Sequence, residues 1–165
     1  METMQPTRWE GEDVTGWLLS AKVDGIRARW TGKGFVSRGG KALPNLPHLA
    51  QSSTVLDGEL SAGSLSKTLA ALGKNGDKSA LAFHSFDAPF SAAPFSERCK
   101  AVSMAFILCR DMDHFGDFVE ECLAGGFEGV VAHHPGNGYG EGVSRSLLKH
   151  KPFIDSEAVC VGVTS

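Results

Sequence analysis

Cationic side chains gather in two short stretches of the chain, in numbers that suit the binding of phosphate groups. The first stretch spans residues 22–41 and contains one acid, Asp24, among the bases Lys22, Arg27, Arg29, Lys33, Arg38 and Lys41. The second stretch contains no acid and contributes Arg145, Lys149 and Lys151. The formal net charge is nonetheless −3. A chain polarised in this way can bind phosphates on one face, although an uneven, solvated surface explains the charges equally well.

Six short motifs follow one another along the chain. In order they are residues 22–27 (K-x-D-G-x-R), 37–40 (S-R-G-G), 56–60 (L-D-G-E-L), 83–87 (F-H-S-F-D), 127–131 (F-E-G-V-V) and 147–152 (L-L-K-H-K-P). Any single one is a weak signal, because patterns of a few residues occur by chance. The ordered set covers roughly residues 15–163 and resembles the covalent nucleotidyltransferases, namely DNA ligases, RNA ligases and mRNA capping enzymes.

The last two motifs resemble ATP-dependent DNA ligases most, especially the small bacterial and phage enzymes. Only 21 residues precede Lys22, too few for the extra N-terminal domain of NAD-dependent ligases, so ATP is the expected donor. The resemblance implies an α+β, nucleotidyltransferase (ATP-grasp-like) fold with two antiparallel sheets and flanking helices. It implies sealing of 3′-OH/5′-phosphate nicks in double-stranded DNA during replication, repair or recombination. An RNA ligase, a capping-type enzyme and a non-catalytic nucleotide- or DNA-binding remnant stay open as alternatives.

The resemblance makes Lys22 the catalytic nucleophile, which displaces pyrophosphate from ATP and carries AMP as a phosphoramidate. A lysine amine attacks phosphorus only when it is neutral, and nearby cations favour the neutral form. Lys149, Lys151 and a bound metal ion are expected to supply that effect. Taken alone, Lys22 would be an ordinary surface lysine, and the five accompanying motifs decide against this alternative.

The resemblance gives the other motif residues roles around the nucleotide. Glu59 is expected to accept a ribose hydroxyl, while Glu128, with Glu59 as a second candidate, holds Mg²⁺ or Mn²⁺, partly through water. Both carboxylates flank apolar runs, where an unpaired charge would be costly. Phe86 is expected to stack on adenine, with simple core packing as the alternative.

Cations from three motifs are expected to contact the ribose and phosphates of ATP and the 5′-phosphate of the nick: Arg27, Arg38, Lys149 and Lys151. Asp24 is expected to position the loop that follows Lys22. Ala21 stands where many small ligases carry Glu. Its backbone can still meet adenine, so the means of nucleotide discrimination is left open.

Local patterns indicate the elements that must position these residues, in an α+β domain with antiparallel sheets. Strands are expected at residues 17–23, 26–30, 35–38, 54–60, 80–87, 107–109, 129–132 and 158–163, and helices at 64–72, 95–106 and 113–123. Residues 44–51 are expected to form a short helix or loop, and residues 136–142, with four glycines, a mobile loop. In the first strand, Leu19 and Ala21 share one face, and Ser20 and Lys22 share the other.

Composition and spacing exclude several other classes of protein. No segment has the roughly 18 unbroken apolar residues of a membrane span, and the N-terminus lacks the pattern of a signal peptide, so we expect a cytoplasmic protein. The four cysteines have no zinc-ligand spacing and are expected to be reduced. His84, His133 and His134 lack a third ligand at a suitable spacing, so exposed or core histidines are expected.

The length of 165 residues predicts one domain, a nucleotidyltransferase (adenylation) domain over residues 1–165. The C-terminal OB domain of ligases, which grips the duplex, has no counterpart in this sequence. The chain is expected to be a monomer that acts on nicked DNA. Whether it is a fragment, a truncated product or a chain that works with an OB domain or partner protein in trans stays open.

Overall fold

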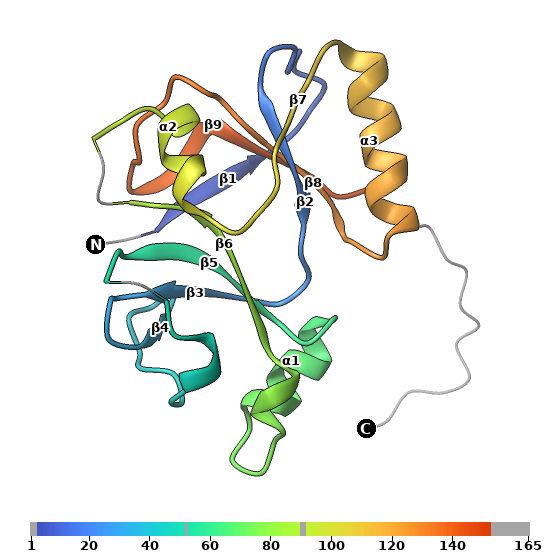
Figure 1. Ribbon diagram of the computed structural model, residues 1–165. Helices are drawn as coiled ribbons and strands as arrows, with labels where there is room; N and C mark the ends of the chain where they lie inside the picture. Colours follow the sequence, from blue (N-terminus) through green and yellow to red (C-terminus); the bar gives the residue numbers. More distant parts are fainter. Residues whose placement is uncertain (1–2, 52, 90–91, 153–165) are drawn as a thin grey trace, which may run out of the picture.

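The computed structural model describes residues 3–51, 53–89 and 92–152. Over these residues the chain forms two β-sheets with helices around them (Figure 1). The strand expected at residues 158–163 lies outside the described residues. In the part of the chain that the structure describes, every helix is too short or too polar to cross a membrane.

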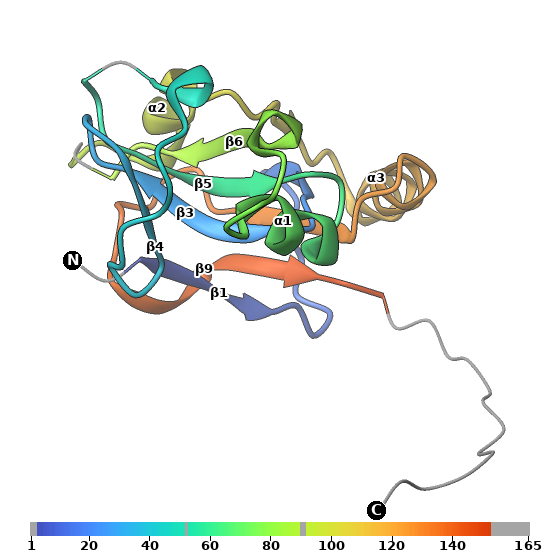
Figure 2. The same cartoon turned by 90° about the horizontal axis from the view of Figure 1, so that it is seen from below.

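The larger sheet has five strands in the order β1-β9-β8-β2-β7. Their bounds are β1 Met4–Arg8, β9 Gly142–His150, β8 Gly129–His133, β2 Leu18–Lys22 and β7 Ile107–Leu108. β1 and β9 run side by side and parallel, as Figure 2 shows, whereas the other pairs in this sheet are antiparallel. The expectation of two purely antiparallel sheets was therefore wrong for this sheet, because the N-terminal residues add a strand along the outer edge of β9.

The smaller sheet has four strands in the order β4-β3-β5-β6, all antiparallel. Their bounds are β4 Phe35–Ser37, β3 Ile26–Trp30, β5 Leu56–Ser61 and β6 Ala82–Asp87. The chain passes from the larger sheet to this one through the turn at Asp24 and Gly25. A Cβ at Gly25 would lie 2.1 Å from the carbonyl oxygen of Leu60, so only glycine lets β3 start this close to β5.

Three α-helices flank the sheets, α1 Leu65–Leu72, α2 Phe95–Arg98 and α3 Met112–Ala124, and short 3₁₀ helices occupy Pro47–Leu49, Lys78–Ala80 and Cys99–Ala101. Side-chain oxygens of Ser64 and Asp111 cap α1 and α3. The helix expected at residues 95–106 was wrong beyond residue 101. There the backbone N–H groups of Ser103 and Met104 donate to Ser85 on β6, which competes with helical hydrogen bonds.

Each sheet packs its outer face against its own core. In the larger sheet Leu19, Val130 and Leu148 contact Phe115 and the rest of the α3 face, and a second cluster lies between the smaller sheet and α1. Because side chains alternate along a strand, Ser20 and Lys22 of β2 point to the other, inner face. This alternation, which the sequence predicts, directs the Lys22 side chain into the space between the sheets.

Candidate active site

A cavity of about 200 Å³ lies between the inner faces of the two sheets. Strands of both sheets line it, so its shape depends on how the sheets are held together. Its charged lining residues are Lys22, Arg27, Glu59 and Lys149, and its apolar ones include Ala21, Phe86, Met104, Val131 and Leu147. The fold thus brings together residues that the sequence predicts as catalytic and nucleotide-binding from four separate motifs.

Lys22 is the last residue of β2 and lies at this cavity beside Glu128. The Lys22 ammonium donates to Oε2 of Glu128, and Lys151 donates to Oε1 of the same carboxylate at 2.6 Å. Partial burial raises the pKa of Glu128, but the hydrogen bonds from Lys151 and Lys22 outweigh it, so the pKa lies below the usual range. The side chain of Lys22 is 25% exposed, which leaves it open to a ligand that enters the cavity.

The position of Glu128 follows from the register of β2 and β8. Its backbone N–H donates to the carbonyl oxygen of Lys22 at 2.9 Å, and Gly129 is the residue opposite Lys22 in the antiparallel pair. Gly129 has φ of +148°, and a Cβ there would lie 2.1 Å from the carbonyl oxygen of His150. The glycine of this motif therefore permits β8 to start against β9, the strand that carries Lys149.

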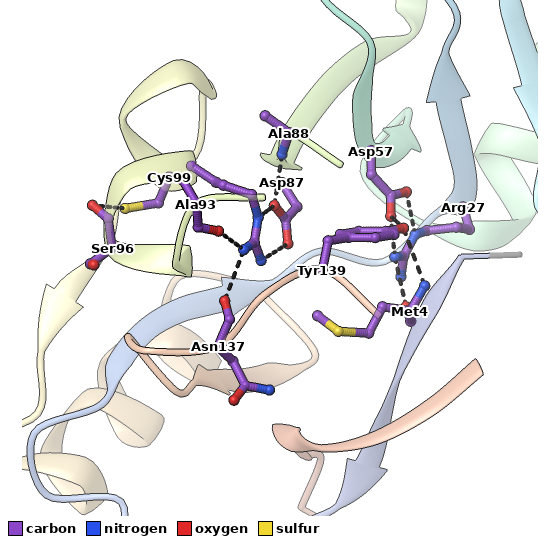
Figure 3. Close-up of polar contacts among 11 residues, drawn as sticks. Met4, Arg27, Asp57, Asp87, Ala88, Ala93, Ser96, Cys99, Asn137 and Tyr139 are labelled. Carbon is purple, nitrogen blue, oxygen red and sulfur yellow. Dashed lines mark hydrogen bonds and ion pairs between the residues drawn. The ribbon is translucent and has the colours of Figure 1, made fainter. Parts of the chain in front are cut away.

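Arg27 lies across the gap between the sheets and has three acceptors (Figure 3). Its guanidinium donates twice to the buried Asp57, at 2.7 and 2.6 Å, and once to the carbonyl oxygen of Met4 at 2.9 Å. Tyr139 donates its hydroxyl to Asp57 at 2.6 Å and accepts the N–H of Met4 at 3.1 Å. Arg27 and Tyr139 thereby link Asp57, on the smaller sheet, to β1 of the larger sheet. Tyr139 itself lies on the glycine-rich loop between β8 and β9.

A second buried ion pair lies next to the first (Figure 3). Arg98 of α2 donates to Asp87, the last residue of β6, at 2.7 and 3.1 Å. The same guanidinium donates to the carbonyl oxygens of Ala93 and Asn137 at 2.6 and 2.8 Å. It therefore joins β6, which carries Phe86, to the loop that carries Tyr139. Neither Arg98 nor Tyr139 could be predicted from the sequence, because nothing local signals which acid a distant side chain will meet.

Phe86 lines the cavity with one face of its ring covered by protein. The guanidinium carbon of Arg27 lies 4.4 Å from the ring centroid, a cation–π arrangement. Burial raises the pKa of Glu59 to about 7, with Arg27 and Lys22 opposing the effect and Glu128 and Asp57 adding to it. A carboxyl group poised in this way accepts hydrogen bonds from a neutral hydroxyl once it has lost its proton.

His133 is a core histidine, one of the two expected alternatives for it. It stacks on Phe95 at 4.4 Å, and its Nε2 lies 3.2 Å from the hydroxyl oxygen of Ser20. Burial lowers the pKa of His133 to about 3, and the charges of Arg27 and Arg98 act in the same direction. Both Ser20 and His133 line the cavity.

Three residues predicted at the nucleotide site, Asp24, Arg38 and Lys151, lie outside the cavity lining. Arg38 follows β4 and is exposed, outside the cavity lining. Asp24 accepts the N–H of Leu65 at 3.0 Å, and its carbonyl oxygen accepts the hydroxyl of Ser61 at 2.6 Å. Asp24 therefore ties the turn after Lys22 to α1.

Within the described residues, no group of three or more His, Cys, Asp and Glu side chains is arranged to hold a metal ion. Glu59 and Glu128 nevertheless both lie close enough to Lys22 for their charges to interact with it. Mg²⁺ commonly uses one or two protein carboxylates together with substrate phosphates and water. The two carboxylates therefore fit an ion that arrives with a nucleotide.

No protein-family profile and no curated protein matches the chain. Solved structures do match it. A Lig E DNA ligase matches with a TM-score of 0.78 and 21% identity, over 92% of this chain and 69% of that one. The Chlorella virus DNA ligase-adenylate matches with a TM-score of 0.78 and 20% identity, over 94% and 70%. The ligase domain of LigD from M. tuberculosis matches with a TM-score of 0.69 and 21% identity, over 91% and 59%.

These likenesses extend over almost all of the chain, which therefore has the fold of the catalytic part of DNA ligases. The chain spans between 59% and 70% of the length of those proteins.

Proposed function

We propose that this chain is the adenylation domain of an ATP-dependent DNA ligase, with the ATP-grasp-like nucleotidyltransferase fold. One observation carries the proposal. Lys22 lies at the mouth of an inter-sheet cavity, paired with Glu128 and accompanied there by Glu59 and Lys149. The likeness of the fold to that of DNA ligases supports the proposal.

The reaction at Lys22 is a transfer of AMP from ATP to the amine. The Lys22 ammonium first loses one proton to solvent, and the lone pair of the resulting amine forms a bond to the α-phosphorus. A second proton leaves the nitrogen for solvent as the phosphoramidate forms. The bond from that phosphorus to the bridging oxygen breaks, and pyrophosphate leaves with the electron pair. Glu128 fixes the amine at the cavity, while Lys151, on the other oxygen of Glu128, reduces the negative charge that favours the ammonium form.

A magnesium or manganese ion, held by Glu128 and Glu59 together with the nucleotide, would neutralise charge that develops on the phosphates. The remaining groups act on the rest of the nucleotide. Glu59 accepts a ribose hydroxyl, the free face of Phe86 stacks on the base, and Lys149 contacts phosphate. Arg27, which also lines the cavity, is held there by Asp57 against the ring of Phe86.

Nick sealing requires a second substrate, nicked double-stranded DNA. The exposed side chains of Arg38, Lys149 and Lys151 suit its 5′-phosphate and backbone. An OB domain or a partner protein acting in trans would supply the remaining contacts with the DNA duplex. With pre-adenylated nicked DNA and Mg²⁺ the chain is expected to seal without any pyrophosphate step. Sealing no better than in the same DNA incubated without the protein would remove DNA joining from the proposal.

The decisive experiment is the intact mass of the protein after incubation with ATP and Mg²⁺. The proposal expects a gain of one AMP that is absent from Lys22→Ala and retained in the control variant Lys33→Ala, which changes an exposed lysine. Label from α-labelled GTP in place of ATP would instead indicate a capping-type or RNA-joining enzyme. Normal ATP binding without any adduct would indicate a non-catalytic remnant.

A further inference from the structure

A second hollow, the basic pocket, lies beside the nucleotide cavity where β1 and β9 end, and has a volume of about 180 Å³. Its lining, over the residues that the structure describes, contains no acid and consists of Arg8, Trp9, Lys149, His150, Lys151 and Pro152. Lys149 lines both the basic pocket and the cavity, so the two meet at this side chain. Arg8 comes from outside the sequence motifs and has no task in the proposed function.

Strand pairing places Arg8 beside Lys149. The two residues are partners in the parallel pair of β1 and β9 (Figure 2), so their side chains leave the sheet on the same face. Immediately after Arg8, the backbone N–H of Trp9 donates to the carbonyl oxygen of Lys149 at 2.9 Å. The ring centroid of Trp9 lies 4.9 Å from that of His150 and 5.1 Å from that of Phe115. The backbone that carries Arg8 is therefore anchored to β9 and to the core beside α3.

The basic pocket favours an anion. Burial lowers the pKa of His150, and the positive charge of Arg8 lowers it further, since the two groups lie close together. Lys151 donates to Glu128, whereas the side chains of Arg8 and Lys149 are exposed at the surface. A guanidinium donates in a fork to the oxygens of a phosphate, and an ammonium adds a point charge. Arg8 and Lys149 therefore match a phosphate group in geometry as well as in charge.

The position of the basic pocket suits the β- and γ-phosphates of a nucleotide. β8 and β9 separate the end of β2, which carries Lys22, from the end of β1, a span of about 14 Å at roughly 4.8 Å per strand. The cavity lining is apolar around Phe86 and Val131 and cationic at Lys149, so a nucleotide directs its base to the first part and its phosphates to the second. With the α-phosphorus at Lys22, the β- and γ-phosphates then lie over β9, between Lys149 and Arg8.

The geometry of phosphoryl transfer gives this place two successive occupants. In an in-line displacement the attacking and leaving atoms lie on opposite sides of the phosphorus. When Lys22 attacks ATP, pyrophosphate therefore leaves from the side away from Lys22. When AMP later passes to DNA, an oxygen of the 5′-phosphate bonds to the α-phosphorus from that same side. The phosphorus–nitrogen bond breaks, and the nitrogen of Lys22 keeps the electron pair and takes up protons from solvent.

We propose that Arg8, together with Lys149, forms a phosphate subsite beside the adenylate, which binds the β- and γ-phosphates of ATP and then the 5′-phosphate of nicked DNA. This inference rests on the proposed function. It gives the N-terminal strand a direct part in substrate binding, in addition to its pairing with β9.

The first arm of the test compares AMP with α,β-methylene-ATP, which has the β- and γ-phosphates but cannot transfer AMP to Lys22. Calorimetry with Mg²⁺ at one fixed ionic strength gives the two dissociation constants. Arg8→Gln removes the charge and keeps most of the length of the side chain. It is expected to weaken the binding of α,β-methylene-ATP roughly tenfold, the lower limit for a hydrogen bond to a charged group, and to leave that of AMP unchanged. A merely structural role of Arg8 would weaken the binding of both nucleotides alike.

The second arm uses the protein that carries AMP on Lys22, with nicked DNA that ends in a 5′-phosphate or in a 5′-hydroxyl. Fluorescence anisotropy measures binding in EDTA, which withholds the metal ion needed for transfer. The wild-type protein is expected to bind the 5′-phosphate end about tenfold more tightly than the 5′-hydroxyl end. Arg8→Gln is expected to lose most of this preference, because the phosphate no longer meets the guanidinium.

Two further variants control for charge and for position. Arg8→Lys retains the positive charge and is expected to recover part of the lost affinity in both arms. Arg110→Gln removes an exposed cation outside both the cavity and the basic pocket, and is expected to behave as the wild-type protein. The melting temperature of each variant shows whether it is folded.

The outcomes separate the two ligands and the two proposals. Loss of the preference in either arm supports the phosphate subsite and identifies the ligand that uses it. Wild-type ratios for Arg8→Gln in both arms, or equal weakening of both ligands in each pair, overturn the inference. Absence of any adduct on ATP instead overturns the proposed function, and the ratio of the dissociation constants for AMP and α,β-methylene-ATP then decides the subsite alone.

Discussion

Glu128 is hydrogen-bonded to Lys22 through both its backbone and its side chain. The N–H of Glu128 donates to the Lys22 carbonyl oxygen at 2.9 Å, and its carboxylate accepts from the Lys22 ammonium. Strand pairing therefore fixes how far the carboxylate lies from the amine, and no loop movement is needed to bring them together. The site is preorganised in the sense that both groups lie on paired strand ends.

Glu128→Gln is predicted to slow adduct formation on the order of 10- to 100-fold, the usual cost of losing a group that holds a metal through water. The amide keeps the shape of the side chain but not its charge. The rate is measured by intact mass over time at saturating ATP and Mg²⁺. Glu120→Gln, an exposed change on α3, serves as the control. Equal rates in all three proteins would contradict the placement of Glu128 at the reacting phosphate.

Asp57→Ala is predicted to lower the free energy of unfolding by about 3–5 kcal/mol, since it leaves the charge of Arg27 without its buried partner. Asp57 is fully buried and accepts from both Arg27 and Tyr139. Urea denaturation measures the change. The exposed pair of Glu97 and Lys100 offers a control, because Glu97→Ala should cost less than about 1 kcal/mol. Similar losses of unfolding free energy in Asp57→Ala and Glu97→Ala would contradict the prediction that Asp57 is the essential buried partner of Arg27.

Gly129→Ala is predicted to destabilise the fold by at least about 2 kcal/mol and to abolish adduct formation. The added Cβ would meet the carbonyl oxygen of His150, a backbone atom, and the positive φ adds strain. Separation of β8 from β9 would then displace Glu128 and Lys149. Gly138→Ala, where nothing lies within 4 Å, should change stability by no more than about 1 kcal/mol in either direction. A Gly129→Ala protein with the melting temperature and the rate of adduct formation of the wild-type protein would contradict this prediction.

Glu59 should make stability depend on pH between its ordinary pKa of 4.5 and its folded-state pKa of about 7. Below the lower value the carboxyl is protonated in both states. Between the two, the unfolded chain loses the proton first, so the contribution of Glu59 to the free energy of unfolding declines as pH rises through this window.

Glutamine does not titrate, so the Glu59→Gln variant does not lose free energy of unfolding in this pH window. Its melting temperature, relative to that of the wild-type protein, is therefore predicted to rise from pH 5 to pH 8. Calorimetry at several pH values measures the difference, with Glu120→Gln as an exposed control that should show no trend. Parallel curves for Glu59→Gln and the wild-type protein would contradict the raised pKa.

Motif residues were the most predictable part of the site, because strand alternation and fixed turns control them locally. Lys22 and Ser20 lie on the inner face, as the period of the strand predicts. The turn at Gly25 and the caps of α1 and α3 also follow from local sequence. What the sequence could not supply were contacts between distant segments, such as that of Tyr139 with Asp57.

The sequence patterns did not predict strands β9 and β1, for related reasons. The segment that forms β9, Gly142–His150, lacks a clean alternation, with two adjacent buried leucines and a polar first half. β1 contains Pro6 and is stabilised by pairing with β9 rather than by its own pattern. An edge strand of this kind depends on its partner, so its existence could be recognised only once the fold was known.

The parallel pairing of β1 with β9 gives residues 4–8 a structural role that their distance from any motif does not suggest. A protein that began after Arg8 would expose the edge of β9 that pairs with β1. The unpaired backbone groups of an exposed edge strand can pair with a strand of another molecule. It would also deprive Arg27 of the Met4 carbonyl and Tyr139 of the Met4 amide. Deletion of β1 would thus produce a protein that is prone to aggregate. The contacts that hold the two sheets together around the cavity would be weakened as well.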